Sequence, residues 1–260
     1  MPNEYLQKLF SLEGRTAVVL GGTSGIGQAI ARGYRSAGAN VVATSRDKAK
    51  VDAMADEFEG AGSRTLRITS DVNSRESLQA LCDATIEAFG TVEFRFVTSG
   101  MLNKATSTDI SDEDWERVMD ANLNGSFKAN QIFGRQMLKQ KNGSIINTCS
   151  MTTFVTFNEV TPYAASKAGV GMLTKQLATE WAKENVRVNA IAPGVFRTPL
   201  NSAALDIPER AGAILGRTPM GRFGHVDELV GTALLLASSA GSFITGQIIA
   251  VDGGFLAKGI

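Results

Sequence analysis

The chain of 260 residues carries 26 basic and 26 acidic side chains, so its formal net charge is zero. Balanced charge provides no long-range field that would attract nucleic acid or an anionic membrane, and neither is expected as a partner. No apolar run approaches the ~18 residues of a transmembrane helix, and the N-terminus lacks the pattern of a secretory signal. Two cysteines, Cys82 and Cys149, are too few for a disulfide framework. A cytoplasmic protein is therefore expected.

Short runs of apolar and β-branched residues alternate with longer segments of helical periodicity. Strands are predicted at 16–21, 40–45, 65–70, 94–99, 144–149, 186–191 and 247–252. Helices are predicted at 25–37, 47–59, 74–89, 112–140, 162–184 and 226–238. Apolar strands that alternate with helices indicate a parallel sheet covered on both sides. The predicted fold is therefore α/β, a single domain over 1–260 with a doubly wound, Rossmann-type parallel sheet of about seven strands.

Two predicted helices begin with the spacing of a capping box, in which two side chains satisfy backbone N–H groups of the first turn. These are Asn73-x-x-Glu76 and Ser111-x-x-Asp114. Arg95 conflicts with the predicted sheet because it lies in the middle of a strand that should be buried. Either a carboxylate partner or a strand end near the surface would accommodate it.

The first predicted strand runs into a glycine-rich turn, LGGTSGIG at 20–27, which precedes the first predicted helix. Glycines let the backbone approach a diphosphate, and the helix directs N–H groups and its positive dipole end at the anion. No Gly-Lys-Ser or Gly-Lys-Thr follows, which disfavours a P-loop nucleotide hydrolase. The turn is predicted to hold the diphosphate of a dinucleotide through Gly21, Thr23, Ser24, Gly25, Ile26 and Gly27.

The end of the second predicted strand distinguishes between the two nicotinamide cofactors. Ser45 and Arg46 stand at this strand tip, which has no carboxylate to bind the adenosine ribose hydroxyls. A guanidinium can clamp a 2′-phosphate through two N–H groups, and serine adds a hydroxyl donor. Asp47 follows and could equally be the N-cap of the next helix. NADP(H) is therefore predicted in preference to NAD(H).

Asp71 and Val72 follow the third predicted strand. One interpretation is a turn that leads into the next helix. The other is a cofactor contact, in which the Asp71 side chain or the adjacent backbone holds the adenine amino group at the sheet edge. Both interpretations are open at the level of the sequence.

The segment TPYAASKAGVGMLTKQLATE (161–180) has the pattern of a helix, with Thr161 as N-cap and Pro162 at the first helical position. Tyr163 and Lys167 then stand at i and i+4, so the phenol and the ammonium share one face. A free tyrosine titrates near pH ~10, and a lysine cation one turn away favours the phenolate. The pair predicts a general acid/base, against the alternative of a surface tyrosine beside a solvated lysine.

With the glycine turn, the pair after the third strand, Ser150, Tyr163 and Lys167 in this order, the sequence resembles a short-chain dehydrogenase/reductase from about residue 12 to its end. The resemblance implies that Ser150 holds the substrate oxygen and that Tyr163 passes it a proton. It further implies that Tyr163 and Lys167 adjoin the cofactor, with Lys167 at the nicotinamide ribose, and that Asn122 positions a water for a proton relay. An amide that bonds its own helix backbone is the alternative for Asn122.

Further along, NAIAPGVFRTPL (189–200) matches the segment that closes over the nicotinamide in this family. The cofactor contacts implied there are Pro193, Gly194, Val195 and Thr198. The segment GQIIAVDGG (246–254) matches the last strand of the family, whose surroundings build subunit contacts. The resemblance therefore also implies a homotetramer.

Two positions depart from the family pattern. Leu20 stands where the family has threonine, and Val97-Thr98-Ser99-Gly100 replaces Asn-Asn-Ala-Gly. Thr98 and Ser99 offer fewer hydrogen-bond donors than asparagine amides, whereas Gly100 still permits close approach to a cofactor. This segment supports a function of another class, a dinucleotide-binding sensor or scaffold subunit without turnover.

The expected activity is hydride transfer between a nicotinamide and a secondary alcohol or ketone, with a small-molecule substrate and no metal. The single histidine, His225, has no nearby Cys or His with which to bind a metal. The stretches TPMGRFG and AVDGGFLAKG resemble the gluconate and deoxygluconate dehydrogenase branch, which implies a sugar acid. A 3-oxoacyl-thioester reductase is the alternative.

The walls of the substrate site are expected from 101–104, 151–160 and 197–220, the last acting as a lid. The apolar surfaces expected there are Phe154, Phe157, Phe196 and Leu200, and the polar groups are Lys104, Arg197 and Asn158.

Overall fold

The computed structural model describes residues 4–98, 100–198 and 201–259. In this part of the chain, six parallel strands form one sheet in the order β2-β1-β3-β4-β5-β6. The strands are β1 (Thr16–Leu20), β2 (Asn40–Thr44), β3 (Phe94–Val97), β4 (Gly143–Thr148), β5 (Val186–Pro193) and β6 (Ile248–Val251). Because the strand order reverses at β1 and β3, the carboxyl ends of these two strands form the switch point at which such sheets bind ligands.

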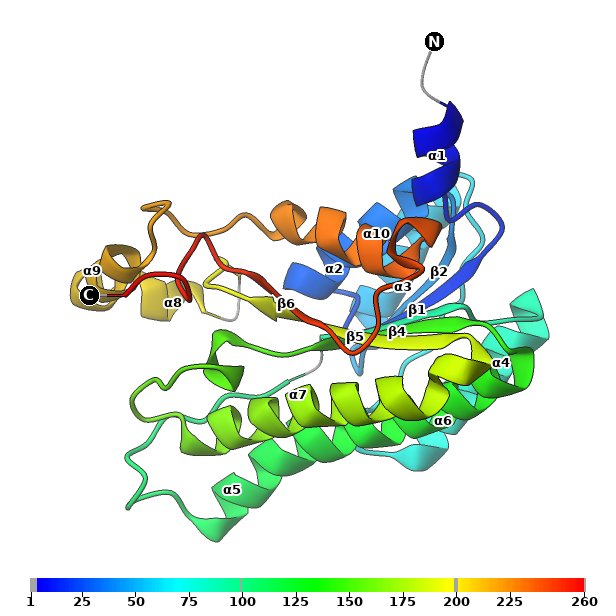
Figure 1. Cartoon of the computed structure of the whole chain (residues 1–260). Helices are drawn as coiled ribbons and strands as arrows, with labels where there is room; N and C mark the ends of the chain where they lie inside the picture. Colours follow the sequence, from blue (N-terminus) through cyan, green and yellow to red (C-terminus); the bar gives the residue numbers. More distant parts are fainter. Residues whose placement is uncertain (1–3, 99, 199–200, 260) are drawn as a thin grey trace.

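Helices cover both faces of the sheet (Figure 1). On one face lie α2 (Gly25–Ser36), α3 (Lys48–Gly60) and α10 (Val230–Ala237); on the other lie α4 (Arg75–Phe89), α6 (Gly125–Gln140) and α7 (Thr161–Trp181). The other helices are α1 (Glu4–Phe10), α5 (Asp112–Met119), α8 (Ser202–Leu205) and α9 (Pro208–Arg217). Short helical turns are η1 (Asp120–Asn124), η2 (Met151–Thr153), η3 (Ala182–Glu184), η4 (Val226–Leu229) and η5 (Ser239–Gly241).

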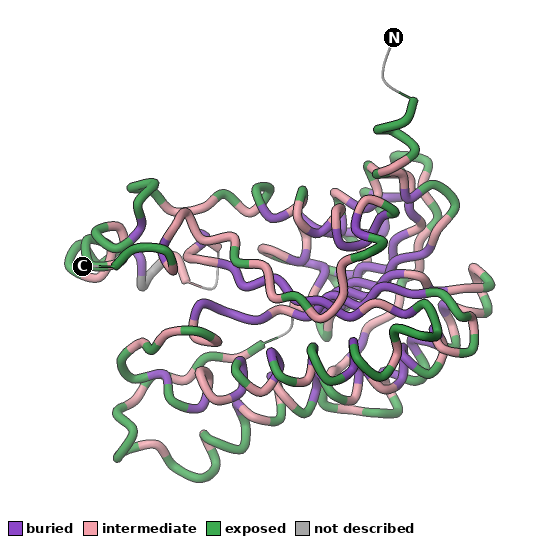
Figure 2. The backbone as a smooth tube through the Cα atoms, viewed as in Figure 1, coloured by how far each residue is buried: buried purple, intermediate pink, exposed green. Residues whose placement is uncertain are grey.

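Two large hydrophobic cores, one on each face of the sheet, hold these layers together (Figure 2), and a smaller cluster is formed by Cys149, Val170, Ala190 and Ala192. In β1, Ala17 and Val19 pack toward α2, α3 and α10, whereas Val18 and Leu20 pack toward α4, α6 and α7. Burying a valine or leucine side chain contributes roughly 1.5–3 kcal/mol. Burial on both faces explains why the strands are apolar throughout, and it confirms the predicted doubly wound α/β fold.

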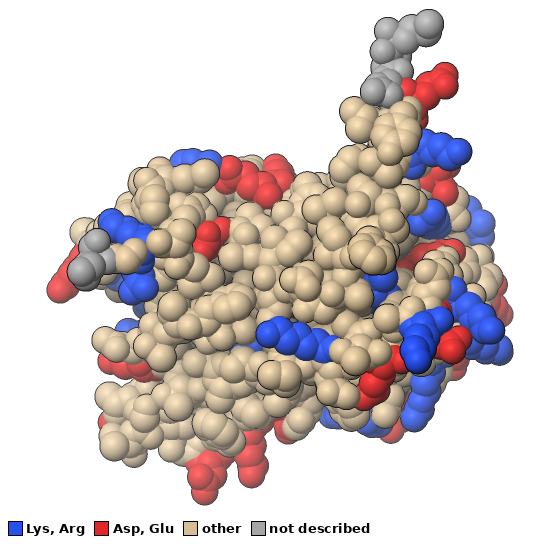
Figure 3. All heavy atoms as spheres, in the orientation of Figure 1, with Lys and Arg blue, Asp and Glu red and all other residues tan. Residues whose placement is uncertain are grey.

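Neither charge dominates the face of the molecule shown in Figure 3. Acidic and basic side chains are interspersed on the face in Figure 3, and much of that face is uncharged. Within the described ranges, none of the helices combines the length and the hydropathy that crossing a membrane requires.

The predicted strand at 65–70 is not a strand in the structure, although this segment runs beside β2. Thr65 Oγ1 donates to Val41 O at 2.6 Å, and Thr44 Oγ1 donates to Ile68 O at 2.7 Å. A backbone hydrogen bond joins the segment 65–70 to the β2 side only at its last residue, where the N–H of Ser70 donates to the carbonyl of residue 45. Because threonine hydroxyls bond the carbonyls that a ladder would use, β2 is the edge strand.

The helix starts agree with the predictions to within one residue. Ser111 caps α5, since its Oγ accepts from Asp114 N at 3.1 Å, but the Asp114 side chain accepts from Arg117 and does not complete the predicted capping box. The prediction for α4 is wrong by one position, because Ser74 and not Asn73 is its N-cap and accepts from Ser77 N at 3.1 Å. The N–H of Asn73 instead donates to a carboxylate two residues earlier, which places it in the turn before the helix.

The long helix predicted at 112–140 is interrupted. α5 and α6 are continuous with the π-helical turn η1 between them, and a π turn inserts an extra residue that re-aims the side chains around it. The sequence does not predict α1, α8 or α9.

Arg95 lies in the middle of β3 and is fully buried, so both sequence-based explanations for it are wrong. Its Nη2 donates to Asn130 Oδ1 at 2.6 Å and to Asn147 Oδ1 at 2.7 Å. Nε and Nη1 have no partner, and no carboxylate among the described residues pairs with the guanidinium. Burial lowers the pKa of Arg95 to about 9.

Candidate active site

The glycine turn after β1 requires glycine at each of its three spaced positions. Gly21 and Gly25 have φ angles of 78° and 52°, which disfavour residues with a Cβ. At Gly27 a Cβ would lie 2.1 Å from Gly21 O and 2.6 Å from Thr98 Oγ1. Ser24 is the N-cap of α2, yet its hydroxyl makes no capping bond. The turn therefore exposes backbone N–H groups and a free hydroxyl at a helix N-terminus, which suits a diphosphate.

Thr98 takes over part of the role expected for the family asparagine. Its N–H donates to Leu20 O at 2.9 Å, and its Oγ1 lies 3.1 Å from Gly21 O. These bonds attach the end of β3 to the start of the glycine turn. Ser99, the next residue of the altered segment, lies outside the described residues.

Gly100 lies against two of the predicted catalytic residues. A Cβ at this position would be 3.3 Å from Asn122 Oδ1 and 3.7 Å from Lys167 Nζ. Glycine here therefore keeps the backbone close to both polar groups.

At the tip of β2, Ser45 and Arg46 have different environments. Thr23 Oγ1 donates to Ser45 Oγ at 2.8 Å, which ties the glycine turn to this tip. Asp47 is the N-cap of α3 and accepts from Lys50 N at 3.2 Å, so the carboxylate is used in the fold. Arg46 is exposed and has no ion-pair partner among the described residues. Its guanidinium is available to a phosphate beside the turn.

The pair at 71–72 is part of the local structure. Asp71 Oδ1 accepts from Asn73 N at 2.9 Å, which is the turn that the first interpretation predicts. Val72 packs against the start of α6, where a Cβ on Gly125 would meet it at 3.1 Å. These contacts fix the segment at the carboxyl edge of the sheet, and an adenine contact remains a prediction.

Tyr163 and Lys167 lie in the first turns of α7. The helix begins at Thr161, with Val160 as N-cap and Pro162 in the first turn, so the predicted cap is wrong by one residue. Lys167 is 4% exposed, and its Nζ donates to Thr148 O at 2.7 Å. The same Nζ is 5.7 Å from the centroid of the Tyr163 ring. The ammonium is thus held next to the phenol, which excludes a solvated lysine.

Asn122 occupies the π turn η1 and is fully buried. Its Nδ2 donates to Met101 O at 2.9 Å and to Ser166 Oγ at 3.0 Å, and its Oδ1 accepts from Met101 N at 2.7 Å. The amide therefore pins the segment after Gly100 to α7. This arrangement contradicts the alternative in which the amide bonds its own helix backbone.

Ser150 follows β4 and begins the turn η2. Its Oγ accepts from Thr152 N at 3.2 Å, so the hydroxyl hydrogen remains available to a further acceptor. Thr153 Oγ1 bonds both the N–H of Ser150, at 3.3 Å, and the carbonyl of Lys167, at 3.2 Å. This threonine joins the serine turn to the helix that carries Tyr163 and Lys167.

The segment after β5 lies against the glycine turn. Gly194 N donates to Val251 O at 2.8 Å, and a Cβ at Gly194 would lie 2.6 Å from Asp252 Cα. The methyl group of Thr198 is 3.5 Å from the position of a Cβ on Gly25. Pro193 ends β5, and Val195 O accepts from the N–H of a later loop glycine. The predicted nicotinamide segment is thus adjacent to the predicted diphosphate turn.

The predicted substrate walls contain paired charges. Lys104 Nζ lies 2.6 Å from Glu159 Oε2, and Arg197 Nη1 lies 2.6 Å from Asp206 Oδ1. Phe154 is exposed and Phe196 is buried. Leu200, another predicted apolar position, and Pro199 of the predicted lid lie outside the described residues.

Two hollows of about 240 and 490 Å³ border this region, but neither is lined by Ser150, Tyr163 or Lys167. The hydrogen bonds that hold Ser150, Lys167 and Asn122 in place therefore locate the site better than the size of a hollow does. Sequence reasoning missed the groups that orient these side chains, which are Met101, Thr148, Thr153 and Ser166. Several of these contacts use backbone carbonyls, which leave no signal in a sequence.

The sequence profile of the family described as Enoyl-(Acyl carrier protein) reductase matches residues 21–256. The 2-dehydro-3-deoxy-D-gluconate 5-dehydrogenase of Bacillus subtilis is 38% identical over 256 residues, covering 98% of this chain and 99% of the relative. The 3-oxoacyl-(acyl-carrier-protein) reductase FabG of Thermotoga maritima is 36% identical over 246 residues, covering 94% and 99%.

A solved structure of a gluconate 5-dehydrogenase from Burkholderia cenocepacia, in complex with NADP and tartrate, superimposes with a TM-score of 0.94 at 35% identity. It covers 98% of this chain and 100% of that one. The glycine turn, the Tyr163–Lys167 pair and these similarities together show that the chain belongs to the short-chain dehydrogenase/reductase family, as a nicotinamide-dependent oxidoreductase that acts on a carbon bearing a hydroxyl group.

Proposed function

We propose that the protein is an NADP(H)-dependent oxidoreductase that interconverts a secondary alcohol and a ketone of a sugar acid. The observation that carries this proposal is the chain of contacts from Asn122 past Gly100 and Lys167 to Tyr163, beside a turn that only glycines can form. The relatives named for gluconate and deoxygluconate, and the NADP complex of one of them, support the substrate class and the cofactor.

The cofactor would extend along the carboxyl edge of the sheet. The glycine turn and the N–H groups at the start of α2 would hold its diphosphate, and Arg46 with Ser45 would bind the 2′-phosphate that distinguishes NADP(H). The adenine would lie near 71–72, and the nicotinamide would lie under 193–198. When bound, the nicotinamide supplies or accepts the hydride.

The protein groups would handle the proton and the developing charge. Ser150 would donate its free hydroxyl hydrogen to the substrate oxygen, and Tyr163 would give that oxygen a proton. Lys167 uses only part of its donor capacity on Thr148 O, so its other N–H groups can serve the ribose. Asn122 would hold the loop that bounds this pocket in place.

The substrate class is tested by comparing kcat/KM for 5-ketogluconate with kcat/KM for an acetoacetyl thioester, using NADPH as reductant. A preference for the sugar acid supports the proposal. A preference for the thioester would favour the second candidate, a 3-oxoacyl-thioester reductase, which the similarity to the T. maritima enzyme supports. Persistent nicotinamide absorbance with every ketone tested would favour a non-catalytic dinucleotide-binding subunit.

We include in the proposal a cytoplasmic homotetramer in which 197–220 acts as a lid. Exposed apolar side chains on three helices favour subunit contacts: Trp115 on α5, Phe127 on α6 and Met172 on α7. The lid is supported by α9, none of whose residues is buried. Analytical ultracentrifugation tests the tetramer, which a monomeric sedimentation coefficient would exclude.

A further inference from the structure

A sugar acid differs from a neutral sugar by its carboxylate, so the site needs a cation that no acidic side chain already neutralises. The two cations expected as polar groups of the substrate walls do not meet this condition. Lys104 is paired with Glu159, and Arg197 is paired with Asp206. Arg210 and Arg217 of α9 are the other cations of the segment 197–220, and neither is paired with a carboxylate among the described residues.

Arg217 is held in position by aromatic rings. Its guanidinium carbon lies 4.9 Å from the centroid of the Phe255 ring. Phe255 in turn stacks on Phe157, with centroids 5.5 Å apart and planes 14° apart. Contact with a ring face leaves the N–H groups in the plane of the guanidinium available, and these match a carboxylate in a bidentate geometry. Arg217 is therefore oriented before any anion binds.

The same stack links Arg217 to the catalytic region. Phe157 lies in the loop between the turn that begins at Ser150 and the helix that carries Tyr163. The three stacked groups come from α9, from the segment after β6 and from this loop, which places α9 next to a predicted wall of the substrate site.

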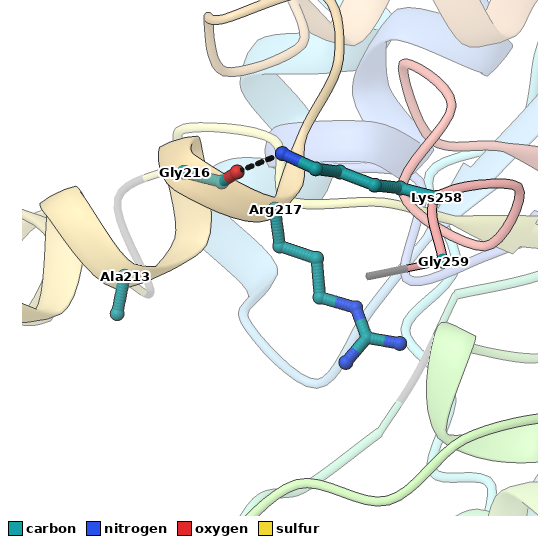
Figure 4. A pocket seen from close by; sticks show the side chains of 5 residues that line it. All are labelled: Ala213, Gly216, Arg217, Lys258 and Gly259. Atoms are coloured by element: carbon teal, nitrogen blue, oxygen red, sulfur yellow. Dashed lines mark hydrogen bonds between the residues drawn. The ribbon is translucent and has the colours of Figure 1, made fainter.

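A second cation, Lys258, lines the same hollow as Arg217. Lys258 Nζ donates to Gly216 O at 2.5 Å, a carbonyl in the last turn of α9, so the C-terminal segment is attached to this helix. The hollow of about 490 Å³ is lined by Ala213, Gly216, Arg217, Lys258 and Gly259. Figure 4 shows the Arg217 side chain extending away from the end of α9, and this residue is exposed. The described residues of this lining contribute two positive charges and no side-chain carboxylate, which favours an anionic ligand.

We propose that Arg217, with Lys258 beside it, binds the carboxylate of the sugar-acid substrate while the ketone of that substrate lies at Ser150 and Tyr163. This inference rests on the proposed function and adds to it the residues that would separate acids from neutral sugars. A charge-assisted, bidentate contact is stronger than a neutral hydrogen bond, and its loss selectively weakens binding of the charged substrate.

The test compares 5-ketogluconate with L-sorbose, the neutral ketose that has a hydroxymethyl group in place of the carboxylate. In Arg217→Met, the ratio of kcat/KM for the acid over kcat/KM for L-sorbose should fall roughly 10- to 100-fold, mainly through KM for the acid. Arg217→Lys should recover part of that ratio because it keeps the charge. Arg210→Met, two turns earlier on the same helix, is the matched control and should stay within about twofold of wild type.

The outcomes separate the two proposals. The wild-type enzyme could reduce 5-ketogluconate while Arg217→Met keeps the wild-type ratio of kcat/KM for the acid over kcat/KM for L-sorbose. That result would overturn the role of Arg217 and leave the proposed function standing. If the kcat/KM ratio falls equally in Arg210→Met, the role of Arg217 is overturned as well, because the ratio would then depend on the total charge of α9 and not on a specific contact. A wild-type enzyme that reduces neither sugar overturns both proposals.

Discussion

Arg95 gives a prediction about stability whose size follows from its burial. Each pKa unit corresponds to about 1.4 kcal/mol, so lowering this pKa from its ordinary value to about 9 makes the charged form cost roughly 5 kcal/mol in the folded state. The two bonds to Asn130 and Asn147 offset part of the cost of burying the charge. Removing one acceptor should therefore lower the free energy of unfolding much more than removing the charge and that acceptor together.

Asn130→Leu alone should destabilise the protein by about 2–4 kcal/mol, because the buried guanidinium keeps only one acceptor. In an Arg95→Met background, the same substitution should be neutral or stabilising, since the charge is gone and the amide would otherwise be unpaired. Urea unfolding of the four proteins at one fixed concentration measures the coupling, which should be at least about 2 kcal/mol. Additive effects of the two substitutions would refute this account of the buried cation.

The pH dependence of stability gives a second measurement of the free-energy cost of burying the Arg95 charge. The folded-state pKa of Arg95 is lowered, so above about pH 9 the unfolded chain binds more protons than the native state. Stability from this group therefore rises with pH between about 9 and ~12, by up to about 1.4 kcal/mol per pH unit, and the full cost returns as pH falls below 9. The difference in unfolding free energy between wild type and Arg95→Met should change in this window; a constant difference from pH 8 to 10.5 would contradict the reasoning.

Three further predictions concern the active site. Tyr163→Phe should lower kcat by ~10²–10⁴-fold while NADPH binding, followed by its fluorescence, is retained; near-normal turnover would remove the role of the phenol. Arg46→Ala should raise KM for NADPH roughly 10- to 100-fold and leave KM for NADH within about twofold, so equal effects on the two cofactors would exclude a 2′-phosphate contact. Gly27→Ala should abolish dinucleotide binding in a calorimetric titration, because its Cβ would lie 2.1 Å from Gly21 O, whereas Gly212→Ala, with nothing within 4 Å, should bind normally.

The sequence by itself determined the features that depend on near neighbours in the chain. The positions of Gly21 and Gly25 can be predicted because a positive φ angle is a local requirement of the turn. The proximity of Tyr163 and Lys167 can be predicted because residues i and i+4 share one face of any helix. The helix starts agree to within one residue for the same reason, since a cap bonds N–H groups two or three positions away. Six of the seven predicted strands correspond to strands, and 65–70 fails because threonine hydroxyls of and near β2 replace a backbone ladder.

Only the tertiary structure decided which distant groups meet. The buried charge of Arg95 is accommodated by amides 35 and 52 residues away, and no local pattern announces such partners. Lys104 and Arg197 look like free polar groups in the sequence but are neutralised by acids, while Arg217 stacks on a ring near the end of the chain. Hydrogen bonds and ion pairs depend on distances of a few ångströms in space, and for groups far apart in the chain those distances exist only once the sheet and its helices have packed.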